Sequence, residues 1–382
     1  MNHILIKSAI ICALLTYSIF PGKQIFQAAA VLLLIFSSTL ILGSRSHRFR
    51  WPELGLLAFF FSTWIIALIR FINSDFLDLI TRIPWNVILY PFTFFCAILV
   101  GKVINKNMAT YHRFFDVLFW VISFGAIVAY LFPDLPLCNG TRPMMVLPGD
   151  AACGFIDNPN YYSFTALVLF FWKKITAGYT VKGEKSAKLR AIDWDLLSLL
   201  GSSRMGLVVL MAQKSLIVKN WRTRIKFLFA GMLLLAMIYI FSPSRLDFTI
   251  DERLGMWNFA WLFILQHPAG VFSPEIYSNA MYAAIGVNGE FQNSLFGMTV
   301  IFGYLGLMLY LVCIIYAFTR IRRISGEQRV WALGILMLFV LNGIVRTHLP
   351  GGVGLISLSF GLLCGFVVQQ ESVISRRLNF RD

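Results

Sequence analysis

Residues 291–323 read FQNSLFGMTVIFGYLGLMLYLVCIIYAFTRIRR, an apolar run over 291–319 that ends in a cluster of arginines. An apolar helix of about 20 residues crosses a hydrocarbon core of about 30 Å. Arginines placed directly after such a run are typical of the cytoplasmic side of a membrane. This stretch therefore predicts a membrane-spanning helix whose carboxyl end faces the cytoplasm.

The same pattern recurs along the whole chain, which is 58% hydrophobic and only 13% charged. This composition excludes an ordinary soluble globular domain. We expect an all-α fold: a polytopic transmembrane helical bundle with about 12 membrane segments, in which residues 1–382 form a single integral membrane domain. The expected segments are 4–20, 25–43, 53–71, 85–104, 114–132, 159–175, 191–201, 205–218, 226–242, 291–319, 330–349 and 352–370.

The cations favour one orientation of these segments. If residue 1 lies in the cytoplasm, 25 of the 33 lysines and arginines fall on the cytoplasmic side. The positive-inside rule then places both termini there. Topology and anionic lipid headgroups explain the net charge of +15, so nucleic acid is excluded as a partner and the lipid bilayer is expected as one. The outward cations are Lys23, Arg70, Arg82, Arg142, Arg204, Arg245, Arg253 and Arg346.

Two outward loops are long. Residues 133–158 are rich in proline and glycine, which indicates irregular chain. This loop holds Cys138 and Cys153, and we expect a disulfide between them because an outside compartment is oxidising. The alternative is two free thiols.

The second long loop, 243–290, is rich in aromatic residues. Within it, residues 252–265 predict an amphipathic helix. Its apolar stripe consists of Leu254, Trp257, Trp261 and Leu265 at helical spacing. We expect this helix to lie in the membrane interface, since tryptophan favours that depth.

Residues 191–218 are too short for two crossings, because both flanks are basic and two spans need about 40 residues. We expect the chain to enter partway, turn near residues 201–206 and return. Arg204 would then lie at membrane depth, where an arginine needs a partner or a function. The alternative is an arginine that snorkels to the outer headgroups.

Four short patterns face outward: Asn158-Pro159-Asn160, Ser203-Arg204-Met205-Gly206, Arg253 followed by His267-Pro268-Ala269-Gly270, and Gln292-Asn293-Ser294 ahead of Gly303 and Gly306. Each has a simpler interpretation. Asn158 and Pro159 suit a helix start. Arg253 suits a headgroup contact, and Gly303 and Gly306 suit close packing between spans.

In this order and on this side, the patterns resemble the O-antigen ligase and O-antigen polymerase superfamily, with the resemblance covering roughly residues 150–320. It implies a metal-independent glycosyltransferase without a cofactor, acting on the periplasmic side of a bacterial inner membrane. The donor would be a glycan on undecaprenyl diphosphate. An acceptor hydroxyl attacks the anomeric carbon, and the lipid diphosphate leaves. We expect Arg204 and Arg253 to hold that diphosphate, because the planar fork of arginine bonds two oxygens at once.

The resemblance further implies Asn160, Asn293 and His267 as substrate-binding residues, and Arg253 and Gln292 as catalytic ones. Gln292 stands where the family has histidine, and glutamine cannot accept a proton near neutral pH. Glu290 is the first candidate for the missing base, with His267 and His348 as alternatives. A simpler role for Glu290 is to cap the helix that follows.

The absence of the family histidine favours a polymerase that joins lipid-linked repeat units over a ligase that transfers glycan to the lipid A core. A chain-length regulator protein would be a further partner of a polymerase. A transporter or flippase of lipid-linked saccharide is the alternative from another class. It predicts paired broken helices and several deep charges, and the sequence shows no internal repeat. No spacing of Cys and His indicates a metal site.

Overall fold

The computed structural model describes most of the helical chain. The described residues are 2–43, 49, 51–74, 85–133, 135, 152–156, 158–177, 197–198, 200, 204–217, 220–223, 225–226, 229, 233, 244–286, 293–324, 326–345, 349–350, 352 and 354–378. Within helices, only the backbone is described at 73–74, 85–86, 159–160, 204–205, 217, 244–253, 344–345 and 371–378.

The described part of the chain is all-helical, apart from one isolated antiparallel bridge between Ser18 and Ile156. The helices are α1 (Asn2–Leu15), α2 (Lys23–Gly43), α3 (Trp51–Ser74), α4 (Trp85–Ile88), α5 (Tyr90–Lys106), α6 (Met108–Leu131), α7 (Pro159–Ala177), α8 (Arg204–Ile217), α10 (Ser244–Gln266), α11 (Pro274–Ile285), α12 (Ser294–Ile321), α13 (Glu327–Val345) and α14 (Leu355–Leu378). The all-α prediction is therefore confirmed.

Four of these helices are long and apolar enough to cross a membrane: Lys23–Gly43, Trp51–Ile72, Met108–Leu131 and Ser294–Ile321. Their ends lie within three residues of the segments expected from the sequence, except that Met108–Leu131 begins six residues before the expected segment 114–132. This agrees with a helical membrane protein, whereas the full set of about 12 segments stays a prediction. The expected segment 226–242 and the turn at 201–203 lie outside the described residues, apart from isolated positions in 226–242.

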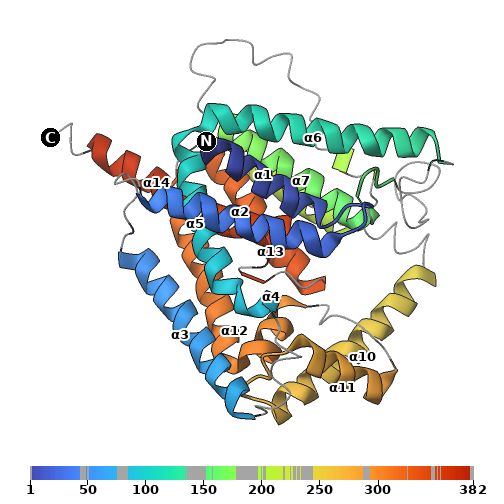
Figure 1. The fold of residues 1–382 in the computed structure, drawn as a ribbon. Coiled ribbons are helices and arrows are strands. Elements are labelled where there is room, and N and C mark those ends of the chain that lie inside the picture. The colour runs from blue at the N-terminus through green and yellow to red at the C-terminus, as the bar shows by residue number, and fades with distance from the viewer. Residues whose placement is uncertain are drawn as a thin grey trace.

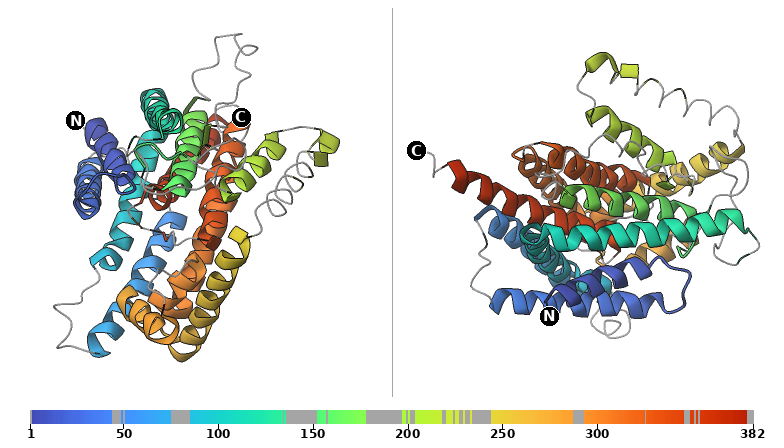
Figure 2. Two further views of the ribbon diagram at one scale, coloured as in Figure 1. Left: turned by 90° about the vertical axis from the view of Figure 1, so that its right-hand side faces the viewer. Right: turned by 90° about the horizontal axis from the view of Figure 1, so that it is seen from above.

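The helices form two groups. In Figure 1 and in both views of Figure 2, α1, α2, α6 and α7 run side by side. Below them in Figure 1 and in the left view of Figure 2 lie α3, α10, α11 and the amino-terminal part of α12. Helix α12 packs against α3 and α10 of the second group, and against α13 and α14, which in turn pack against α7 of the first group. This long helix therefore connects the two groups.

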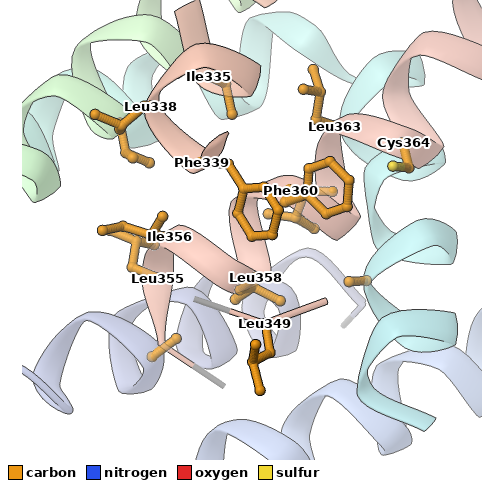
Figure 3. Close-up of a cluster of buried hydrophobic side chains, with 14 of the residues drawn as sticks. Ile335, Leu338, Phe339, Leu349, Leu355, Ile356, Leu358, Phe360, Leu363 and Cys364 are labelled. Atoms are coloured by element: carbon orange, nitrogen blue, oxygen red, sulfur yellow. The ribbon is translucent and has the colours of Figure 1, made fainter. Parts of the chain in front are cut away.

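Glycines and stacked rings bring the central helices close together. A Cβ atom at Gly101 of α5 or Gly365 of α14 would collide with the backbone of the other helix, so these two helices touch directly. Phe339 of α13 stacks on Phe360 of α14 with ring centroids 4.1 Å apart, within the apolar cluster of Figure 3. Phe94 of α5 continues the stack, 6.2 Å from Phe360.

One end of α3 is fixed to α5 by a buried ion pair. Lys102 Nζ of α5 donates to Glu53 Oε2 of α3 over 2.7 Å, and both side chains are at most 3% exposed. The ammonium also lies 4.5 Å from the centroid of the Phe49 ring. A charge this deep needs such compensation, since burial of an unpaired ion is strongly unfavourable.

Two other predictions concern partly described segments. Helix α8 has 14 residues and is therefore about 21 Å long, shorter than a bilayer core of about 30 Å. That length agrees with a segment that does not cross fully. Cys153 is disulfide-bonded, as expected, while its predicted partner Cys138 lies outside the described residues.

Candidate functional site

Helix α12 is broken at Gly303. This residue has φ 68° and ψ −162°, a conformation that is essentially restricted to glycine, while the residues on both sides are helical. The break divides α12 into residues 294–302 and 304–321. A break inside an apolar helix exposes backbone groups that lipid cannot satisfy, so it persists only where protein or a wet cavity covers it.

The segment between α10 and α11 covers this break with its own backbone. Val271 N–H donates to the carbonyl of Val300 over 2.8 Å, and Phe272 N–H donates to the carbonyl of Ile301 over 2.9 Å. On the other side of the break, the amide of Tyr304 donates to the carbonyl of Pro268 over 3.2 Å. The crossing of residues 267–273 over the break, hereafter the 267–273 crossing, is therefore a fixed part of the fold.

Two glycines make the crossing possible. Gly270 has φ +80°, and a Cβ atom there would collide with the backbone of Ile301 and Gly303. A Cβ atom at Gly303 would in turn collide with Pro268 and Ala269. The sequence predicted that Gly303 allows two membrane spans to pack closely. Gly303 does allow a close approach, but its partner is the loop at Pro268 and Ala269 and not another span. Gly306 packs against Met298 and Phe302 of its own helix, across the break.

A cavity of about 290 Å³ lies beside the crossing. Its lining consists of Arg70, Pro268, Ala269, Phe302, Tyr304 and Leu305. Arg70, in the last turns of α3, donates from Nη1 to the carbonyl of Ala269 over 3.4 Å. The neighbouring Phe71 ring lies 5.4 Å from the Phe272 ring, so α3 closes this side of the crossing.

Asn293 is the N-cap of α12. Its Oδ1 accepts from the amides of Leu295 over 2.8 Å and Phe296 over 3.4 Å, and its backbone is extended. The cap satisfies amide groups that the first helical turn leaves free. The structure thus gives Asn293 a structural role, in addition to the substrate contact that the sequence predicts.

The predicted amphipathic helix is present as α10. Met256, Ala260, Phe263 and Ile264 form its buried face, while Leu254, Trp261 and Leu265 are each more than half exposed. The predicted stripe is therefore the face that α10 leaves uncovered, as expected of a helix in contact with lipid. Trp257, at the edge of this stripe, meets Phe296 of α12 with ring centroids 6.4 Å apart.

The remaining predicted site residues are only partly described. Arg204 is the first residue of α8, Asn160 is the second residue of α7, and Arg253 lies within α10, each with the backbone alone described. Glu290 and Gln292 lie outside the described residues. The shared grip of Arg204 and Arg253 on a diphosphate, and the base role of Glu290, therefore stay predictions.

His267 begins the crossing. Its side chain is exposed and its ring centroid lies 4.4 Å from that of Phe263. Nearby, burial against Phe259 and Phe263 raises the pKa of Tyr277 to about 12, so this phenol is not a base near neutral pH.

The described residues contain no group of three or more His, Cys, Asp or Glu side chains that could hold a metal ion. Sequence reasoning noted Arg70 as an outward cation but gave it no role in the site. Its contact with Ala269 joins positions 199 residues apart in the chain, which no local pattern signals.

Comparisons with known protein families, curated proteins and solved structures find no match to this chain.

Proposed function

We propose that this protein is a metal-independent membrane glycosyltransferase that polymerises repeat units of a surface polysaccharide of the O-antigen type. Its donor would be an oligosaccharide linked to undecaprenyl diphosphate, and its site would face the periplasm across a bacterial inner membrane. Both termini would be cytoplasmic, with about 12 membrane segments and the loops 133–158 and 243–290 outside. A chain-length regulator would act with it.

One observation carries this proposal. Pro268 and Gly270 belong to one outward pattern of the sequence, and Gly303 belongs to another, yet these residues meet at the 267–273 crossing. The contact requires glycine at both positions, which gives a physical reason for residues that the superfamily resemblance selects. Arg253, in the same helix as the exposed stripe, and Asn293, at the start of α12, belong to the helices that border the crossing.

The chemistry suits a site of this kind. When an acceptor hydroxyl attacks the anomeric carbon, negative charge builds on the departing diphosphate. Arginine side chains held beside it stabilise that charge in the transition state without a metal. Because the lipid diphosphate is already an activated leaving group, the reaction needs no cofactor.

The broken helix also bears on the transporter alternative, since unwound helices coordinate cargo in many transporters. Here, however, the carbonyls of Val300 and Ile301 at the break accept hydrogen bonds from the crossing. Because backbone amides of the crossing already bind these carbonyls, the break is better suited to a structural role than to binding an ion. The ligase alternative rests on the acceptor side, where Gln292 in place of the family histidine favours a polymerase.

Deletion of the gene tests the function directly. Loss of a polymerase leaves single repeat units on the lipid A core, whereas loss of a ligase leaves bare core and accumulated lipid-linked chains. Normal surface glycan in the deletion strain would overturn both forms of the proposal.

Reporter fusions test the orientation. Fusions after residues 145 and 270 should report the periplasm, and fusions after residues 182 and 325 the cytoplasm. A cytoplasmic signal at residue 270 would place the crossing in the wrong compartment for a lipid-linked glycan.

A further inference from the structure

The length of α3 would place Arg70 at the depth of a lipid headgroup. Helix α3 begins at Trp51, whose side chain is 86% exposed, and Arg70 follows 19 residues later. At a rise of about 1.5 Å per residue the two are about 28 Å apart along the helix, close to the thickness of a hydrocarbon core. If α3 spans the bilayer in the proposed orientation, Trp51 lies at the inner boundary and Arg70 at the outer one.

A hydrogen bond to the backbone orients the guanidinium of Arg70, and this bond uses only one of its N–H groups. Its described hydrogen bond is the one to the carbonyl of Ala269, which uses a single N–H of the five that arginine carries. Among the described residues it has no carboxylate partner. A positive charge oriented in this way beside a cavity favours an anionic ligand, and the planar fork of arginine suits phosphate oxygens.

The surface next to the cavity is apolar. On α3, Ile65, Ile66 and Ile69 are exposed, and on the adjoining helix α12 the exposed side chains include Tyr304, Met308 and Leu311. A ligand with its anionic group in the cavity could therefore lay a hydrocarbon chain along α3 or α12. Free phosphate has no apolar part that could contact this surface, whereas the hydrocarbon chain of a lipid with a phosphate headgroup could.

We propose that the cavity between Arg70 and the Pro268–Ala269 backbone is a binding site for the phosphate headgroup of a lipid. As a deepening of the proposed function, on which this identification rests, the lipid is the polyprenyl diphosphate carrier of the donor. Arg70 then holds the headgroup at the outer boundary, beside the break of α12. Arg70 is a binding residue in this scheme; the bond-making step belongs to other side chains.

Lipid binding by the purified protein tests this site without any glycan synthesis. Native mass spectrometry would compare retention of a polyprenyl diphosphate and of phosphatidylglycerol by the wild type, Arg70→Gln, Arg70→Lys and Lys23→Ala. Gln keeps a hydrogen-bond donor but carries no charge, and Lys keeps the charge without the fork. Lys23→Ala removes an exposed outward cation remote in sequence from the cavity and serves as the control.

We expect Arg70→Gln to weaken polyprenyl diphosphate binding roughly 10-fold or more, Arg70→Lys to weaken it less, and Lys23→Ala to leave it unchanged. Undiminished binding by Arg70→Gln would overturn the site. Equal losses for both lipids would support a general phospholipid headgroup site and overturn the assignment to the donor.

A second variant guards against a folding artefact. Leu305→Trp fills the cavity without changing any charge, and it should weaken the same binding while the protein stays monodisperse in detergent. Normal binding by a folded Leu305→Trp protein would contradict the cavity as the location. If the deletion strain makes normal glycan, the glycosyltransferase proposal fails, yet these measurements still decide whether Arg70 binds a phosphate lipid.

Discussion

The two ends of α3 place their charged side chains in opposite environments, one buried and one exposed. At one end Glu53 is 1% exposed and paired with Lys102 of the neighbouring helix. At the other end Arg70 is exposed, donates to the carbonyl of Ala269 in the 267–273 crossing and borders a cavity. The first charge is neutralised by the fold itself, whereas the second has no carboxylate partner among the residues that the structure describes. The difference separates a residue that holds the bundle together from one that we propose binds a ligand.

The same contrast appears among the glycines. Gly101 and Gly365 have ordinary helical conformations and let two straight helices touch, which serves packing alone. Gly270 and Gly303 have positive φ and let a loop cross a broken helix. Changes at the first kind of position should therefore reduce the amount of folded protein, and changes at the second kind should reduce function in protein that still folds.

The largest effect is expected at the buried end of α3. Glu53→Ala leaves Lys102 buried without its partner, which costs about 3–5 kcal/mol. The melting temperature in detergent and the yield from membranes should both fall sharply. The double variant Glu53→Met/Lys102→Met removes both charges and should recover most of the loss. A single variant as stable as the wild type would show that this ion pair is not what fixes α3 to α5.

Gly303→Ala should have the largest effect on function relative to folding. Alanine at this φ and ψ is strained by roughly 1–3 kcal/mol, and its methyl group would also displace the crossing. We expect glycan polymerisation to be lost while the protein is still inserted at a reduced level. The matched control is Gly286→Ala, which has φ +70° but no atom within 4 Å of the new methyl group. Equal glycan output from the two variants would contradict a functional role for the crossing.

A smaller effect is expected at the start of α12. Asn293→Ala removes an N-cap, at a cost of about 1 kcal/mol, and Asn293→Ser should restore much of that stability. Thermal unfolding measures the cap, and glycan chain length measures function. If Asn293 only caps the helix, Asn293→Ser should restore both. Restored stability with short glycan chains would instead support the substrate contact predicted from the sequence.

Particular residues show how far sequence reasoning reached. Hydropathy located α2, α3 and α12 to within three residues and α6 to within six, because a membrane span must be long and apolar whatever its neighbours are. Helical spacing identified the apolar stripe of α10, since a helix repeats every 3.6 residues regardless of its surroundings. The sequence carries no comparable pattern from which the contacts between these helices could be predicted.

The sequence by itself determined the helical fold and the apolar segments, because both depend on local composition and spacing. Only the tertiary structure decided that Gly303 meets a loop instead of a span, that Glu53 is paired, and that Arg70 reaches Ala269, 199 residues away. These contacts join segments far apart in the chain, and a residue's type does not specify which distant backbone will lie beside it. Packing settles that choice, since close approach, charge compensation and backbone hydrogen bonding must all be satisfied together.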